Sequence, residues 1–122
     1  MKLRIKGNSI RLRLSRSDVK SFGESGHFAE TTQFPGHTLN YCLQRGGNGN
    51  DLCASIHNNT IMVMMPDEMA EKWVNTETVG YHSEMRTGIA GSLFILVEKD
   101  FQCLDETVED QSDNFENPGK IC

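Results

Sequence analysis

The sequence predicts an α+β fold of about eight antiparallel strands and two helices, forming a curved sheet or a barrel. Two observations indicate this fold class. Short segments of alternating apolar and polar residues recur along the chain with turn residues between them, and two helix-like segments each follow a hairpin. A chain of 122 residues can bury one modest core, so we expect residues 1–122 to form a single domain.

The first predicted hairpin spans residues 3–14. Apolar and polar residues alternate on both sides of Gly7-Asn8, which predicts two strands joined by a two-residue turn. This register gathers five cations on one face of the hairpin, namely Lys2, Arg4, Lys6, Arg11 and Arg13. Because like charges opposite one another destabilise a sheet, we expect this face to attract an anion.

A short helix follows this hairpin. Ser15 and Asp18 have the spacing of a capping box, and Gly26 is a suitable helix end. Val19 and Phe22 would form the buried stripe of this helix. The next strands are expected over residues 27–33 and 38–44, before a glycine-rich loop.

The second half of the chain repeats this order. The expected elements are a hairpin over 52–57 and 60–65, a helix from Pro66-Asp67, and strands at about 79–85 and 92–98. With a shift of 51 residues the halves align without a gap over about 24 residues, and Phe22 falls on Trp73. We therefore predict an internal repeat of strand-strand-helix-strand-strand over about residues 1–46 and 52–98, related by a pseudo-two-fold axis.

Charge is segregated along the chain. Residues 1–20 carry seven cations and one acid, whereas residues 98–120 carry eight acids and two cations. The acidic C-terminal segment, residues 99–122, lacks periodicity and either wraps around the domain or is disordered. The basic hairpin face is therefore a solvated face, a face neutralised by this segment, or a site for a phosphorylated or other anionic ligand.

The four cysteines fit no zinc-binding spacing. If the strand over 38–44 pairs with the strand over 52–57, Cys42 lies opposite or diagonal to Cys53, in a row with Met64. Three interpretations are open: packed reduced thiols, a cross-strand disulfide, and a soft-metal site that includes His57 on the same face.

Other motifs exclude several function classes. The glycines around Gly47 match neither a Walker nor a dinucleotide-binding pattern, and the sequence has no nucleophile elbow. The net charge of −5 and the lack of aromatic residues among the cations argue against nucleic acid. Without a membrane-spanning apolar run or a signal peptide, we expect a cytoplasmic monomer or small homo-oligomer.

Two stretches resemble an uncharacterised bacterial family of small proteins. They are the opening K-L-R-I-K-G-N-S-I-R-L-R-L, and the closing V-E-K-D-F-Q-C-L with E-D-Q-S-D-N-F-E-N-P. The resemblance implies no catalytic residue, but it implies that the acidic segment is part of the folded unit.

The duplicated plan is also similar to the adenylate cyclase and thiamine triphosphatase (CYTH) superfamily, whose barrels bind polyphosphate and a divalent metal. Under this likeness Glu98, Asp100 and Glu84 would hold Mg²⁺ or Mn²⁺ while the cations hold phosphates. The E-x-E-x-K signature of that superfamily is absent, since cations occupy its place on the first strand.

We therefore predict a small binding or interaction module, without a required cofactor, for an anionic small ligand or a protein partner. The alternative is a divergent metal-dependent (poly)phosphate hydrolase.

Overall fold

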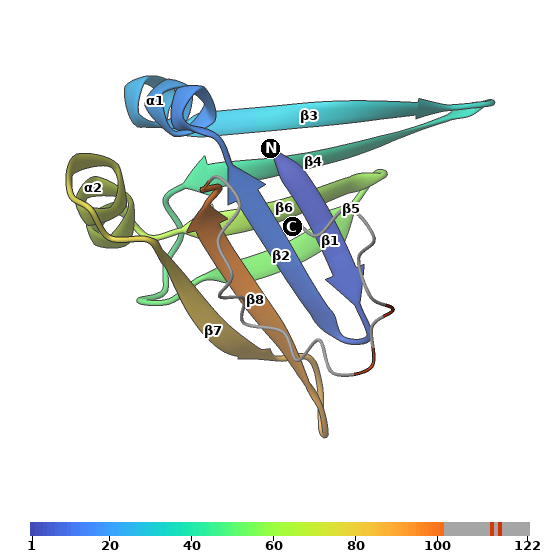
Figure 1. Ribbon diagram of the computed structural model, residues 1–122. Coiled ribbons are helices and arrows are strands. Elements are labelled where there is room, and N and C mark those ends of the chain that lie inside the picture. Colours follow the sequence, from blue (N-terminus) through green and yellow to red (C-terminus); the bar gives the residue numbers. More distant parts are fainter. Residues whose placement is uncertain (102–112, 114, 116–122) are drawn as a thin grey trace.

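The computed structural model of the chain describes residues 1–101, 113 and 115 (Figure 1). The first half forms β1 (Lys2–Lys6), β2 (Ser9–Leu14), α1 (Arg16–Ser25), β3 (His27–Phe34) and β4 (His37–Arg45). The second half forms β5 (Cys53–His57), β6 (Thr60–Met65), α2 (Asp67–Asn75), β7 (Gly80–Arg86) and β8 (Ser92–Lys99). The α+β class is confirmed, and both halves have the same order of elements. That the halves are a sequence repeat stays a prediction.

The strands form two four-stranded sheets, so of the two expected arrangements, a curved sheet or a barrel, the closed barrel does not form. Sheet A has the order β1-β2-β8-β7, and sheet B has the order β3-β4-β6-β5. Each sheet therefore takes one hairpin from each half of the chain. The reason lies in the helices, since each helix follows the first hairpin of its half and leads the chain from one sheet to the other (Figure 1).

The expectation of an entirely antiparallel arrangement is also wrong. In sheet A β2 runs parallel to β8, and in sheet B β4 runs parallel to β6. A tight turn determines the partner on one side of a strand, whereas tertiary packing determines the partner on the other side. The predicted register of the first hairpin is confirmed, with Lys2 opposite Arg13 and Arg4 opposite Arg11.

Both helices begin where the sequence predicts. Ser15 caps α1, and its side chain and that of Asp18 form a reciprocal capping box. Gly26 ends α1 with a φ of 77°, a left-handed conformation that favours glycine. Pro66 precedes the first turn of α2. Neither of these short helices could cross a bilayer, and the rest of the described chain contains no other helix that could.

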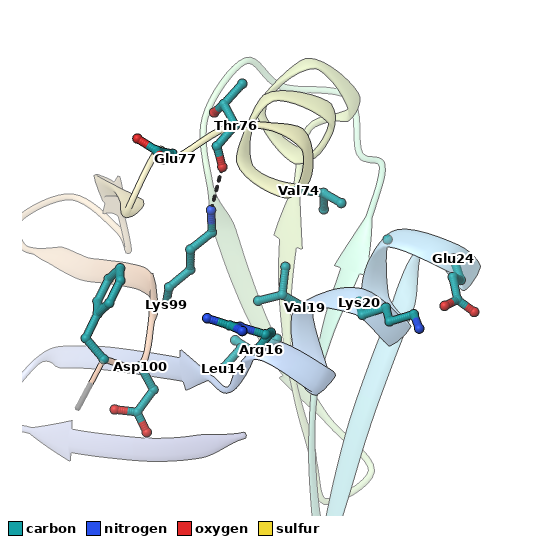
Figure 2. A pocket seen from close by; sticks show the side chains of 12 residues that line it. Leu14, Arg16, Val19, Lys20, Glu24, Val74, Thr76, Glu77, Lys99 and Asp100 are labelled. Carbon is teal, nitrogen blue, oxygen red and sulfur yellow. Dashed lines mark hydrogen bonds between the residues drawn. The ribbon is translucent and has the colours of Figure 1, made fainter.

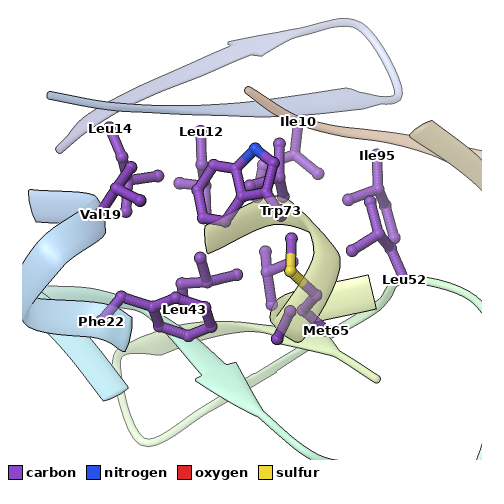
Figure 3. Packing of buried hydrophobic residues seen from close by; sticks show 13 residues of the cluster. Ile10, Leu12, Leu14, Val19, Phe22, Leu43, Leu52, Met65, Trp73 and Ile95 are labelled. Atoms are coloured by element: carbon purple, nitrogen blue, oxygen red, sulfur yellow. The ribbon is translucent and has the colours of Figure 1, made fainter. Parts of the chain in front are cut away.

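The core lies between the two sheets and the helices (Figure 3). Trp73 is its largest fully buried side chain, and Phe22 meets it edge to face with ring centroids 5.9 Å apart. Phe22 and Trp73, which align with each other when the two halves are compared, are therefore in contact at the centre of the core. Burying each large apolar side chain contributes about 1.5–3 kcal/mol. The strands supply the rest of this core from their inward positions, including Leu12, Leu43 and Ile95.

The predicted row of Cys42, Cys53 and Met64 does not form. The strand β4 pairs with β6 and not with β5, so Cys42 lies opposite Met62 whereas Cys53 lies opposite Met64. The two cysteines are thus two strands apart, roughly 10 Å, and a disulfide needs Cα atoms within about 7 Å. Both thiols are free, and Cys42 is buried.

Candidate functional site

The outer face of sheet A brings the five predicted cations together, and we call it the basic face. Each cross-strand row of this face continues from β1 and β2 onto β8 and β7. One row joins Lys2, Arg13, Glu98 and Gly80; the next joins Arg4, Arg11, Leu96 and His82; the third joins Lys6, Ser9, Phe94 and Glu84. The parallel pairing of β2 with β8 is what places one acidic and two apolar side chains directly beside the cations.

Two carboxylates neutralise one end of the basic face. Arg11 Nε and Arg13 Nε both donate to Glu98 Oε1, over 2.9 and 2.8 Å. Asp100 Oδ2 lies 2.9 Å from Lys2 Nζ, and Asp100 Oδ1 lies 3.9 Å from Arg13 Nη1. Of the acidic C-terminal segment, Asp100 is the residue that the described part of the chain places on this face, and Glu98 belongs to β8, so neutralisation by the segment as a whole stays a prediction.

Part of this face is withdrawn from solvent. Arg11 is 8% exposed, Glu98 9% and Leu96 8%, although all three belong to the outer side of the sheet. An ion pair in such a setting is screened less than a surface pair. The same burial makes each charge costly without its partner, so Arg11 and Glu98 depend on each other.

A small hollow of about 140 Å³ lies at the other end of the basic face. Its lining consists of Arg4, Lys6, Ser9, Ile10, Arg11, Phe94 and Leu96. The Ser9 hydroxyl donates to the Lys6 carbonyl oxygen over 2.7 Å. Beside the hollow, the ring of Phe94 stacks on that of His82 with centroids 5.8 Å apart. Three cationic and three apolar residues therefore surround one concave point.

A larger cavity of about 920 Å³ lies between α1 and α2, at the end of β2 and β8 (Figure 2). The sequence reasoning did not identify it, because its walls come from both halves of the chain. The helices approach closely at one wall, where a Cβ on Gly23 would lie 2.7 Å from Val74 Cγ1. A side chain at position 23 would force this contact apart.

Among the groups away from these hollows, Asp18 and Cys42 have shifted pKa values. The pKa of Asp18 is below its usual range: burial acts to raise it, but hydrogen bonds from the Met1 amino group and from Ser15 outweigh burial. Burial raises the pKa of the Cys42 thiol. A raised thiol pKa lowers the thiolate fraction, so Cys42 is a poor nucleophile at neutral pH.

The acids that would hold a metal in the hydrolase alternative do not converge. Glu98 and Asp100 are engaged by cations. Glu84 lies opposite Phe94, four residues along β7 from the position opposite Glu98, or roughly 13 Å. Over residues 1–101, 113 and 115, no three His, Cys, Asp or Glu side chains lie together as a metal site would require.

The sequence reasoning found the cations but missed their neighbours. Phe94 and Leu96 join the site only through the pairing of β2 with β8, whereas Ser9 lies opposite Lys6 in the first hairpin itself. The one available signal was the alternation of β8, which places Phe94, Leu96 and Glu98 on a common face.

Comparison with known proteins gives one match. The model of a family of unknown function, DUF7009, matches residues 1–119. It therefore includes most of the acidic C-terminal segment. No curated protein and no solved structure matches the chain.

Proposed function

We propose that this chain, which belongs to the DUF7009 family of unknown function, is a binding module that holds an anionic small ligand on the basic face. The resemblance to an uncharacterised family is thereby confirmed, and membership brings no activity with it. The observation that supports the proposal is the hollow where Arg4, Lys6 and Arg11 surround one concave point. Phosphate is the group that such a cluster of cations suits best.

Charge supports this assignment. Five cations occupy the face, where Glu98 pairs with Arg11 and Arg13, and Asp100 pairs with Lys2. Arg4 and Arg11 face each other across β1 and β2, a like-charge arrangement that destabilises a sheet. An anion in the hollow would accept charge-assisted hydrogen bonds from these side chains.

Size limits the part of the ligand that is held. A hollow of 140 Å³ is smaller than the roughly 300–1,000 Å³ of a typical site for an organic ligand. It accommodates a single phosphate-sized group, while the remainder of the ligand would extend over the exposed surface. The nearby apolar wall of Phe94 and Leu96 lowers the local dielectric and strengthens each contact to that group.

One specific observation favours the acidic C-terminal segment as a second occupant of the basic face. The chain itself already places Glu98 and Asp100 on the basic face, and six more acids follow between residues 105 and 116. The acidic C-terminal segment would then compete with an external anion for the same cations. Its charge complements the face, and the family match includes most of it.

A thermal-shift titration with tripolyphosphate at low salt tests the proposal, with and without Mg²⁺ or Mn²⁺. A ligand that binds the folded state raises the melting temperature with concentration. We expect a metal-independent rise for the native chain that is reduced in Lys6→Gln and retained in Arg45→Gln, since Arg45 is a cation of sheet B. No rise with any phosphate would overturn the anion site.

Further arms of this experiment separate the alternatives. A rise that requires the metal ion would favour the phosphohydrolase. A response to a short DNA duplex in place of tripolyphosphate would contradict a small-ligand site. Ending the chain after Leu104 tests the second occupant: if the segment covers the basic face, the shortened chain loses stability at low salt and binds tripolyphosphate more tightly. Unchanged stability and affinity, with an unchanged circular dichroism spectrum, would contradict that docking.

A further inference from the structure

The cavity between α1 and α2 is distinct from the basic face and combines apolar walls with three cations, Arg16, Lys20 and Lys99. Leu14, Val19 and Val74 supply apolar surface, and Phe101 adds an aromatic ring at the rim. Arg16 and Lys99 are the cations nearest the middle of the cavity, and Figure 2 shows the Arg16 guanidinium pointing toward Lys99. The volume of about 920 Å³ falls in the range of sites for organic ligands.

The acids of the lining do not neutralise these cations. Asp100 directs its carboxylate to Lys2 and Arg13 on the neighbouring sheet face. Glu24 and Glu77 lie at opposite ends of the cavity in Figure 2, away from Arg16. Across the described parts of the chain, no ion pair to Arg16 is found within 4.0 Å.

The position of Arg16 is not explained by helix stability. Arg16 is the first residue of α1, where the helix dipole favours an acid and disfavours a cation. Lys99 does have a structural role, because its Nζ donates to the Thr76 carbonyl oxygen at the end of α2 over 2.8 Å. An ammonium group has three donors, so this bond is compatible with a further contact to an anion.

From these observations we infer that the cavity is a second binding site, for a small amphipathic anion with an apolar body and a carboxylate or phosphate head. The head contacts Arg16, which can donate two parallel hydrogen bonds to either group, with Lys99 beside it. The body lies against Val19, Val74 and Phe101. Because the walls come from both helices, the ligand bridges the two halves of the chain.

Calorimetric titration of the full chain with three probes tests this site. Decanoate carries both features, decanol carries only the apolar body, and acetate carries only the head. We expect decanoate to bind at least about tenfold more tightly than decanol, the discrimination of one charge-assisted contact, and acetate not to bind. Equal affinities for decanoate and decanol, or no binding of decanoate, would overturn the inference.

Three variants locate the site. Arg16→Gln should lower the affinity for decanoate to that for decanol and leave decanol unaffected. Phe101→Ala should weaken the binding of both decanoate and decanol, because Phe101 contributes only apolar area. Lys6→Gln makes the same change of charge on the basic face and should leave decanoate binding intact. If Lys6→Gln lowers the affinity for decanoate and Arg16→Gln does not, decanoate binds to the basic face and the cavity site is contradicted. This conclusion does not depend on the outcome for tripolyphosphate.

Discussion

Arg11 and Glu98 form a buried ion pair that joins β2 to β8 across 87 residues of sequence, with Arg11 Nε 2.9 Å from Glu98 Oε1. This pair lies on the outer side of sheet A, at the junction of the two hairpins that compose the sheet. Arg11 also lines the hollow of the candidate site, so the pair lies between the acidic end of the basic face and that hollow. The pair thus connects the stability of the fold to the proposed function.

Glu98→Gln should destabilise the chain strongly. The substitution keeps the shape of the side chain but removes the negative charge that pairs with the buried Arg11, and breaking a buried pair costs about 3–5 kcal/mol. The free energy of unfolding in urea measures the loss. The matched control is Arg45→Gln, which removes partly exposed pairs with Asp67 and Glu71 and should cost at most about 1 kcal/mol. Equal losses in the two variants would contradict the importance of the buried pair.

Local patterns predicted the elements and their hairpins but not the assembly of the sheets. The Gly7-Asn8 turn and the alternation around it were sufficient for the register of β1 with β2. Nothing in these patterns shows whether β4 pairs with β5 or, as observed, runs parallel to β6. The predicted row of Cys42, Cys53 and Met64 was therefore wrong. The cations were found because they share one hairpin. Phe94 and Leu96 were missed because they reach the site from the other half of the chain.

Gly80→Ala should destabilise sheet A beside the ion pair. Gly80 lies opposite Glu98, and a Cβ there would come 2.1 Å from the Val97 carbonyl oxygen, which the backbone cannot accommodate without moving. Forced overpacking of this kind costs about 1–3 kcal/mol or more. Urea unfolding measures the effect. Gly88→Ala is the control, because a Cβ there meets nothing within 4 Å. A Gly80→Ala chain as stable as the control would show that the sheet adapts to the added atom.

Asp18→Asn should destabilise the chain near neutral pH and much less in acid. The pKa of Asp18 is lowered in the folded state, so the unfolded chain binds its proton more readily. The resulting stabilisation is present above the unfolded pKa of about 4 and is lost as the pH falls through the folded pKa. Loss of the capping interaction costs about 1 kcal/mol.

Urea unfolding at pH 7 and at pH 3 compares Asp18→Asn with the native chain. The difference in unfolding free energy should shrink at pH 3. Glu68→Gln, a change in the first turn of α2, serves as the control for a general effect of removing an acid. A difference that is the same at both pH values would contradict the assigned role of the Asp18 carboxylate.

Cys42 should react with iodoacetamide at least about tenfold more slowly than Cys53 in the folded chain, because a buried thiol with a raised pKa reacts only after local opening. Cys53 is partly accessible. Mass spectrometry of peptides after timed quenching measures both rates. Urea should bring the two rates together. Comparable rates in the folded chain would contradict the burial of Cys42 in β4.

The binding of tripolyphosphate to the basic face, followed by ¹H–¹⁵N correlation spectra of the full chain at low salt, tests the central claim most directly. The amide signals that shift should belong to the lining of the hollow, namely Arg4, Lys6, Ser9, Arg11, Phe94 and Leu96, and the shifts should diminish in Lys6→Gln. Signals that stay in place throughout, or that move only outside sheet A, would contradict an anion site on this face.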